Sequence, residues 1–337
     1  MSDFTTFIAA DDPRLEYSDY ADLEFISLPQ ISSTPVARMS RPLESPTGYN
    51  CDNPGARLRF CTDAEKINVK LNYSDKHLPV AARNSKGIYL IDGKFSSNWN
   101  FSSKTNGKFD FDLQIPGHGL HMYEIIMPYA APVDIIGIEV NAKAEFSKSQ
   151  NRPEFRCIFY GDSVTQGFTA DSIENTYPFL LSQKLNWQMI NMGIAGRSSN
   201  PDDAKIISQI DADMLIVFIG VNDWQSGVKP SKYKNNLKTF VKKIRLIRND
   251  LPIFLISPLW VPPSWKPQAA KHKLSDYRLQ VFELVNELAA SQIKYIDGAK
   301  LIDHNDKYFD QISVHPNTDG FKIMANRLFA HFHFNIH

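Results

Sequence analysis

Apolar and polar residues alternate in short runs through the first 150 positions of the chain. Residues 66–73, Lys-Ile-Asn-Val-Lys-Leu-Asn-Tyr, show this period of two, which predicts a half-buried β-strand. Turn-forming pairs such as Asp92-Gly93 lie between such runs, which recur at 56–60, 87–91, 108–115, 121–127 and 133–140. Many short strands with regular turns predict an antiparallel β-sandwich.

From residue 155 the pattern changes to apolar runs that alternate with helical periods. The runs at 155–160, 187–191, 214–220, 253–257 and 294–297 predict strands, and 176–185, 233–249, 277–292 and 321–332 predict helices. Strands separated by single helices predict a parallel sheet covered on both faces. We therefore expect two domains, 1–150 and 151–337, joined by the polar segment 142–153.

Composition and charge narrow the class of partner. The chain has 337 residues, and its 37 basic side chains balance its 37 acidic ones, so net charge gives no reason to expect nucleic acid or an anionic membrane. No stretch approaches the roughly 20 apolar residues of a membrane span. The three cysteines show no metal-ligand spacing. The first residues lack the basic and apolar regions of a signal peptide, so a cytoplasmic location is the expectation, with the oligomeric state open.

A candidate nucleophile follows the first strand of the second half. Residues 157–167 read Cys-Ile-Phe-Tyr-Gly-Asp-Ser-Val-Thr-Gln-Gly, an apolar run that breaks into a polar turn. This places Ser163 at the carboxyl edge of the predicted sheet, where open α/β sheets keep their chemistry. A helix that begins there would offer the N–H groups of its first turn to a developing negative charge. A plain turn with a capping serine is the competing interpretation.

Three further motifs follow later strands or precede the last helix. The loop 191–198 contains two glycines, which allow a backbone to approach a ligand closely. The segment Gly220-Val221-Asn222-Asp223 supplies a side-chain amide of the kind that stabilises an oxyanion, although helix capping is a frequent use of such residues. Near the end, His315 precedes Pro316 and could act as a general base to a serine hydroxyl.

Together and in this order, Gly-Asp-Ser, Gly, Gly-x-Asn-Asp and His-Pro resemble the SGNH (GDSL-type) hydrolase family over roughly residues 155–332. The resemblance implies a flavodoxin-like three-layer α/β/α domain. It implies Ser163 as nucleophile and His315 as base. It also implies an oxyanion hole made by the Ser163 N–H, the Gly196 N–H and the Asn222 amide, with no metal or organic cofactor.

The resemblance extends to the first half of the chain. Segments such as 45–48, 56–63 and 87–90 look like the antiparallel, jelly-roll-like β-sandwich that precedes the hydrolase domain in some bacterial members. Those two-domain members are similar to carbohydrate esterases that remove acetyl groups from sugars. The resemblance therefore implies a small-molecule or glycan ester as the substrate.

The chain departs from the family pattern beside the presumed base. The family usually has an aspartate three residues before the histidine, and this chain has Ile312 there, with Asp310 five residues before His315. Asp310 could reach His315 through a local bulge. A backbone carbonyl or another acid could instead hold the imidazole and leave a Ser–His dyad, or the site could be impaired.

The predicted function is hydrolysis of short-chain acyl esters, acetyl esters foremost, on a carbohydrate or a glycosylated small molecule. Arg197, Trp224 and Trp260 are candidate substrate-binding residues, although packing explains the two tryptophans equally well. A thioesterase or lysophospholipase is the alternative within the enzyme class. Outside it, the chain could be a carbohydrate-binding protein with a weakened triad.

Overall fold

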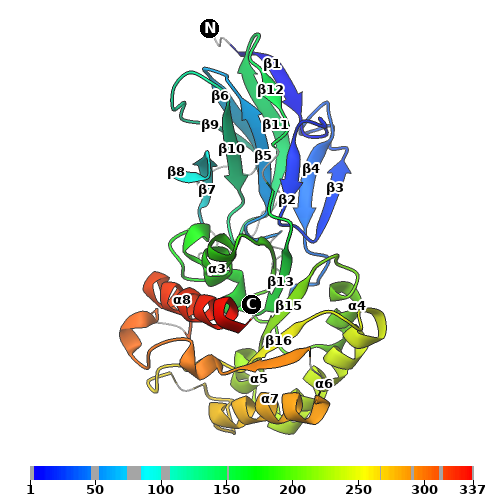
Figure 1. Cartoon of the computed structure of the whole chain (residues 1–337), viewed down its shortest axis with the longest axis vertical. Helices are drawn as coiled ribbons and strands as arrows, with labels where there is room; N and C mark the ends of the chain where they lie inside the picture. Colours follow the sequence, from blue (N-terminus) through cyan, green and yellow to red (C-terminus); the bar gives the residue numbers. More distant parts are fainter. Residues whose placement is uncertain are drawn as a thin grey trace. The chain divides into compact units, whose positions relative to one another are not determined.

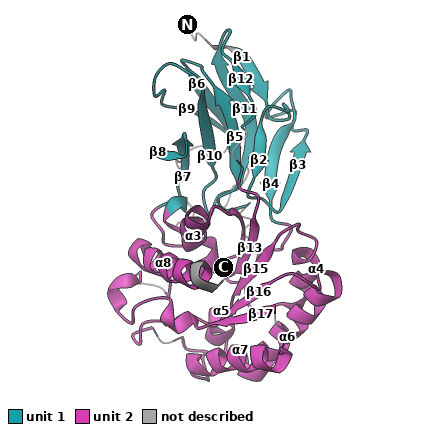
Figure 2. Cartoon of the chain, in the orientation of Figure 1, with its two compact units in different colours: residues 1–41, 49–152, 172–174 teal, residues 42–48, 153–171, 175–337 magenta. Residues whose placement is uncertain are grey.

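The structure is a computed structural model that describes residues 4–46, 53–73, 85–99, 107–149, 152–265, 267–289, 292–310 and 314–335. It divides into two compact units (Figure 2). Unit 1 comprises residues 1–41, 49–152 and 172–174, and unit 2 comprises 42–48, 153–171 and 175–337. The two units thus exchange short segments of sequence. That the chain forms two independently folding domains, divided at residue 150, stays a prediction.

Unit 1 contains two antiparallel sheets, as the alternating runs predicted. One sheet is ordered β3-β4-β11-β6-β9 with β1 also paired to β11, and the other β12-β5-β10-β7-β8 with β2 also paired to β5. The strands of the first sheet are β1 (Phe4–Ala9), β3 (Asp22–Ile26), β4 (Val36–Ser40), β6 (Ile67–Tyr73), β9 (Gly107–Asp112) and β11 (Val133–Asn141). Those of the second are β2 (Glu16–Ser18), β5 (Arg57–Thr62), β7 (Gly87–Ile91), β8 (Lys94–Trp99), β10 (His121–Ile126) and β12 (Phe146–Ser147).

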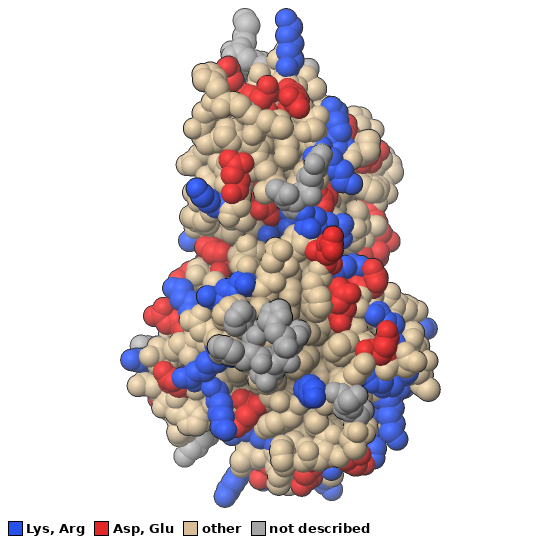
Figure 3. Space-filling model, in the orientation of Figure 1, with Lys and Arg blue, Asp and Glu red and all other residues tan. Residues whose placement is uncertain are grey.

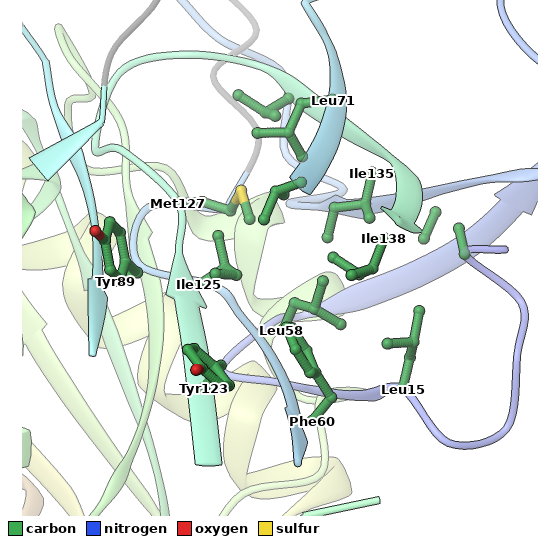
Figure 4. Packing of buried hydrophobic residues seen from close by; sticks show 14 of the residues in the cluster. Leu15, Leu58, Phe60, Leu71, Tyr89, Tyr123, Ile125, Met127, Ile135 and Ile138 are labelled. Atoms are coloured by element: carbon green, nitrogen blue, oxygen red, sulfur yellow. The ribbon is translucent and has the colours of Figure 1, made fainter. Parts of the chain in front are cut away.

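The core of unit 1 lies between these sheets (Figure 4). Leu58, Phe60 and Ile125 of one sheet and Leu71 and Ile138 of the other are among the fully buried members of a single apolar cluster. Because side chains alternate across a strand, the residues that alternate with these core residues along each strand point to the opposite face of the sheet. The two sheets therefore pack as a sandwich, and burial of this cluster holds it together.

A buried ionic cluster lies on the other face of strands β5 and β10. Glu124 accepts hydrogen bonds from Arg59 Nε at 2.8 Å and Arg57 Nη1 at 3.1 Å. Asp19 lies 3.5 Å from Arg57 Nε, and all four side chains are at most 7% exposed. Charges so deeply buried are tolerated because opposite signs are paired and hydrogen-bonded.

Unit 2 is built on five parallel strands within its described residues, in the order β14-β13-β15-β16-β17. Counted along the chain this order is 2-1-3-4-5, which is that of flavodoxin-like doubly wound folds. The strands are short, and the inner strands β15 and β16 are wholly apolar and buried, as burial on both faces requires. The strands are β13 (Arg156–Gly161), β14 (Gln188–Gly193), β15 (Met214–Phe218), β16 (Ile253–Ile256) and β17 (Ile293–Ile296).

Helices cover both faces of this sheet (Figure 1). Neighbouring residues of β13 point to opposite faces, and Phe159 contacts Tyr177 of α3, whereas Tyr160 stacks on Phe240 of α6. Helix α8 joins the layer of α3 through a stacked contact between Tyr177 and Phe321. The α-helices are α2 (Ser163–Gln166), α3 (Tyr177–Leu185), α4 (Ala204–Ile207), α5 (Val221–Gln225), α6 (Pro230–Ile247), α7 (Leu274–Leu288) and α8 (Thr318–Asn335), and the 3₁₀ turns are η1 (Ile173–Asn175), η2 (Pro201–Asp203), η3 (Gly298–Lys300) and η4 (Asp306–Tyr308).

The predicted fold class, an antiparallel sandwich followed by a parallel α/β sheet, is confirmed. The predicted linker 142–153 is wrong in part, because β12 (Phe146–Ser147) lies within it and pairs with β5. In the part of the chain that the structure describes, no helix has both the length and the apolar character to cross a bilayer. Acidic and basic side chains are interspersed over the face seen in Figure 3.

Candidate active site

Ser163 lies where the sequence predicts it, two residues after the end of strand β13, which is an inner strand of the sheet. Asp162 caps the following short helix α2, because its carboxylate accepts a hydrogen bond from the Val164 N–H at 3.0 Å. Ser163 is therefore the first residue of that helix, and its own N–H belongs to the turn that has no partners within the helix. The side chain stands at the carboxyl edge of the sheet.

Two glycines allow α2 to lie against the strand ends. A Cβ atom at Gly161 would collide with the Thr165 side chain, and one at Gly193 would collide with the backbone of Gln166. The contact is also fixed by hydrogen bonds, since Asn191 Nδ2 donates to the Thr165 carbonyl at 2.9 Å. The glycines of two separate motifs thus serve one purpose, which is to seat the serine turn closely on the sheet.

Ser163 and His315 meet across 152 residues of sequence. The Ser163 Oγ and His315 Nε2 atoms are 2.6 Å apart, within hydrogen-bond distance. His315 comes three residues before helix α8, on a segment where Phe309 bridges to Pro316 and the Asp310 N–H donates to the His315 carbonyl at 2.9 Å. This pairing of a hydroxyl with an imidazole is the geometry of a nucleophile and its general base.

Burial sets the protonation state of the histidine. It lowers the pKa of His315 to about 4, against an ordinary value of 6.5, because the imidazolium would lose its hydration. The negative charge of Asp310 acts in the opposite direction and raises that pKa. At neutral pH the imidazole is therefore uncharged and able to accept a proton. Ile312, where the family pattern has its aspartate, lies outside the described residues.

The two other predicted oxyanion donors come from neighbouring loops. Gly196 adopts a left-handed φ of 77° in a turn closed by the Arg197 N–H, which donates to the Ile194 carbonyl at 3.1 Å. The Gly196 N–H takes no part in that bond. Asn222 Nδ2 donates one hydrogen to the Arg197 carbonyl at 3.1 Å, which fixes the amide, and an amide nitrogen carries a second hydrogen.

Two buried carboxyl groups support these loops. Burial raises the pKa of Asp162 to about 7, and the nearby charge of Asp223 adds to the rise. Burial also raises the pKa of Asp223, which accepts hydrogen bonds from the Ser199 N–H at 2.8 Å and the Ser199 hydroxyl at 2.6 Å. Asp223 thereby ties the loop after β14 to helix α5.

Sequence reasoning missed the segment that follows α2. The ring of Phe168 lies beside that of His315, with 5.9 Å between centroids. Thr169, in a left-handed conformation with φ of 72°, donates its hydroxyl to the Pro316 carbonyl at 2.8 Å. A β-branched residue is uncommon in that conformation, and no sequence pattern announces it. These residues fasten the serine loop to the histidine loop.

The predicted substrate-binding residues differ in exposure. Arg197 is buried, and its Nε atom lies 3.2 Å from Asp203. Trp224 is also buried and donates to the His272 carbonyl at 3.0 Å, which favours packing over contact with a substrate. Trp260 is half-buried, stacks on His304 and makes a T-shaped contact with Phe309. All three roles remain predictions. Across the described ranges, no group of three or more His, Cys, Asp or Glu residues is arranged to hold a metal ion.

The model of the GDSL-like lipase/acylhydrolase family matches residues 159–323, which include Ser163, Gly196, Asn222 and His315. No curated protein sequence matches the chain.

Three solved structures are similar over almost the whole chain. A salicylyl-acyltransferase from a tetracycline biosynthetic pathway has a TM-score of 0.81 at 20% identity, covering 99% of each chain. A family two carbohydrate esterase from Cellvibrio japonicus has a TM-score of 0.71 at 17% identity, covering 98% of this chain and 97% of that one. One from Clostridium thermocellum, solved with cellohexaose, has 0.71 at 13%, covering 96% and 99%. At such identities the likeness establishes a shared two-part fold.

Proposed function

Since residues 159–323 belong to the GDSL-like lipase/acylhydrolase family of serine hydrolases, we propose that this protein hydrolyses short-chain acyl esters, acetyl esters foremost, on a carbohydrate or glycosylated substrate. The observation that carries the proposal is the 2.6 Å approach of Ser163 Oγ to His315 Nε2. Since burial keeps the imidazole neutral at pH 7, the pair is ready to react without a further proton transfer.

In the proposed mechanism His315 Nε2 takes the hydroxyl proton while Ser163 Oγ bonds to the ester carbonyl carbon. The carbonyl oxygen becomes an oxyanion, which the Ser163 and Gly196 N–H groups and the Asn222 amide stabilise. The tetrahedral intermediate collapses, and the imidazolium gives its proton to the departing alcohol. A water molecule then attacks the acyl-serine by the same steps and releases the acid.

Two kinds of observation support a sugar as the part of the substrate that carries the acyl group. The chain shares its two-part fold with the Cellvibrio japonicus and Clostridium thermocellum carbohydrate esterases, and the second was solved with cellohexaose. In addition, the aromatic surface of Trp260 belongs to the loop after β16 and reaches the histidine segment through Phe309. Apolar ring faces suit the C–H faces of pyranose rings.

The test is hydrolysis of p-nitrophenyl esters from acetate to octanoate. We expect kcat/KM to be highest for acetate and to fall by roughly 10⁵-fold or more in Ser163→Ala, since removing the nucleophile of a serine hydrolase has about that effect. Ser231→Ala, at an exposed serine of helix α6, is the matched control and should keep full activity. A folded Ser163→Ala protein with wild-type turnover would rule out the proposed mechanism.

The same assay separates the alternatives. A maximum at long acyl chains or on acyl thioesters would favour a lysophospholipase or thioesterase, and no turnover of any ester would favour a carbohydrate-binding protein. The likeness to the salicylyl-acyltransferase suggests one further experiment, because the acyl group of an acyl-serine can be transferred to an alcohol as well as to water. Added glycosides that become acylated at the expense of free acid would reveal transfer.

A further inference from the structure

A groove of about 410 Å³ opens on unit 1, and its lining includes no residue of the proposed mechanism. Strands β1, β6, β9 and β11 and the loop after β3 contribute its walls. Its lining includes Phe7, Ser33, Lys70, Lys108, Asp110 and Ile136. All of them belong to unit 1, whereas Ser163 and His315 belong to unit 2.

An aromatic ring forms part of the groove. Ile8 is in the sandwich core and Phe7 precedes it, so Phe7 points to the opposite face of β1, where it is 42% exposed. The ring lies over Gly137 of β11, because a Cβ atom there would come within 2.7 Å of it. The glycine therefore clears the sheet surface for a flat, partly exposed ring beside Ile136.

Polar groups of both signs surround this ring. Lys70 is 3.2 Å from Glu139, and Asp110 accepts a hydrogen bond from Asn68 Nδ2 at 2.8 Å. Lys108 and Ser33 are exposed at the rim. Of the charged lining residues, Lys70 is paired with Glu139, which is not itself a lining residue, and Lys108 and Asp110 carry opposite charges. The groove therefore has no large net charge that would attract a strongly charged ligand. It does offer donors and acceptors next to an apolar surface.

We propose that this groove is a binding site for a neutral oligosaccharide. One face of a pyranose ring is formed by C–H groups that pack on an aromatic ring, while its hydroxyl groups exchange hydrogen bonds with lysine, carboxylate and serine side chains. The volume accommodates about two sugar rings in an open groove of ordinary ligand-pocket size. Since the groove lies wholly in unit 1, it can hold a glycan whether or not Ser163 turns over an ester.

The test is native gel electrophoresis through soluble neutral polysaccharides, namely hydroxyethylcellulose, xylan, β-glucan and glucomannan. We expect at least one of them to retard the full-length protein. Phe7→Ala should weaken that retardation about tenfold or more, as loss of a ring contact of about 1.4 kcal/mol would. Phe95→Ala is the matched control, since Phe95 is similarly exposed on β8 of the other sheet. Hydrolysis of p-nitrophenyl acetate should be unchanged in both variants.

A second variant guards against a folding defect. Ser33→Trp removes no buried contact and places an indole over the groove, so it should also abolish retardation while leaving the melting temperature unchanged. Retardation that persists in both groove variants would assign glycan binding to another site and overturn the proposal. Absence of retardation by all four polysaccharides, or retardation by polygalacturonate alone, would overturn it as well. Hydrolysis of p-nitrophenyl acetate tests the proposed esterase function independently of glycan binding in every case.

Discussion

Ser163 and His315 share a hydrogen bond in surroundings from which water is largely removed. This desolvation governs the pH dependence of activity, because it lowers the pKa of His315, the general base. We expect kcat/KM for p-nitrophenyl acetate to fall only as the pH drops through about 4, where the imidazole takes up its proton. A pH–rate profile over the range in which the protein stays folded measures this. An acid limb between pH 6 and 7 would contradict the assignment of a desolvated base.

The Asp310→Asn variant tests the electrostatic link at the same scale. Asp310 raises the pKa of His315, so its removal should move the acid limb to lower pH. If Asp310 also orients the imidazole as a third triad member, kcat should fall as well, by up to about 10⁴-fold. Asp306→Asn, at an exposed carboxylate of the preceding turn, is the control and should alter neither quantity. An unmoved limb in Asp310→Asn would remove Asp310 from the site.

Asp162 gives a prediction about stability. Its pKa is about 7 in the folded protein against an ordinary value of 3.8, so between these values the folded state binds more protons than the unfolded state. The contribution of Asp162 to the free energy of unfolding therefore decreases as the pH rises from about 4 to about 7. His315 acts oppositely, because its lowered pKa makes stability rise with pH between about 4 and 6.5.

The Asp162→Asn variant isolates that contribution. Asparagine can still cap α2, so the helix should persist while the titrating proton is lost. The difference in melting temperature between wild type and variant should grow in favour of the variant as the pH rises from 4.5 to 7.5. Because His315 is common to both proteins, its effect cancels. Parallel melting curves across this range would show that Asp162 does not titrate there.

At the scale of elements, the hydroxyl of Thr169 is one of the contacts that tie the loop after α2 to the loop before α8. Thr169→Val keeps the branched shape but loses the bond to the Pro316 carbonyl. We expect kcat for acetyl ester hydrolysis to fall about tenfold with little change in KM, because His315 would no longer be held at Ser163. Thr169→Ser keeps the hydroxyl and should retain activity. Equal losses in both variants would indicate a general folding effect instead.

The strand pattern predicted much of each sheet, and its omissions have physical reasons. The runs behind β5, β6, β7, β10 and β11 all contribute residues to the core, and in β6 the core residues Ile67, Val69, Leu71 and Tyr73 alternate without a break. Strand β8 reads Lys-Phe-Ser-Ser-Asn-Trp and lies at a sheet edge, where neither face demands a regular alternation. Strands β1 to β4 were missed as well. In unit 2 every predicted strand is present, and the clearest are β15 and β16, whose residues are all apolar and buried.

The candidate site shows the same limit. Ser163 and His315 could be predicted because their chemistry is recognisable from short motifs, and the structure brings them together. Thr169 could not, because its part depends on a left-handed backbone angle in a residue type that seldom adopts it. The burial of Arg197 and Trp224 could not be predicted from the sequence either, since both residue types occur at protein surfaces as well as in interiors.

At the scale of the whole molecule, each unit includes a short segment from the other half of the sequence. Unit 2 takes residues 42–48, where Leu43 is buried, and unit 1 takes residues 172–174. A fragment of residues 151–337 therefore lacks part of its own unit. We expect it to melt several degrees below the corresponding transition of the full chain, since one buried leucine contributes about 1.5–3 kcal/mol.

The missing segment can be returned to this fragment. A synthetic peptide of residues 38–50 should raise the melting temperature in proportion to its concentration, and a scrambled peptide should not. Calorimetry of the fragment with each peptide measures the effect. A fragment that melts like the full chain without the peptide would support the simpler division at residue 150.

The ionic cluster of unit 1 has a consequence for how the sandwich assembles. Arg59 and Glu124 stand opposite each other in the pairing of β5 with β10. A slip by one residue would turn these charges toward the apolar cluster and separate each from its partner, at a cost of several kcal/mol. Misaligned pairs of β5 and β10 should therefore separate soon after they form. We infer that the arginines of β5 select the correct register of β5 and β10 during folding. Replacing the cluster with apolar residues would then raise the free energy of unfolding but increase the fraction of chains that fold with misaligned strands.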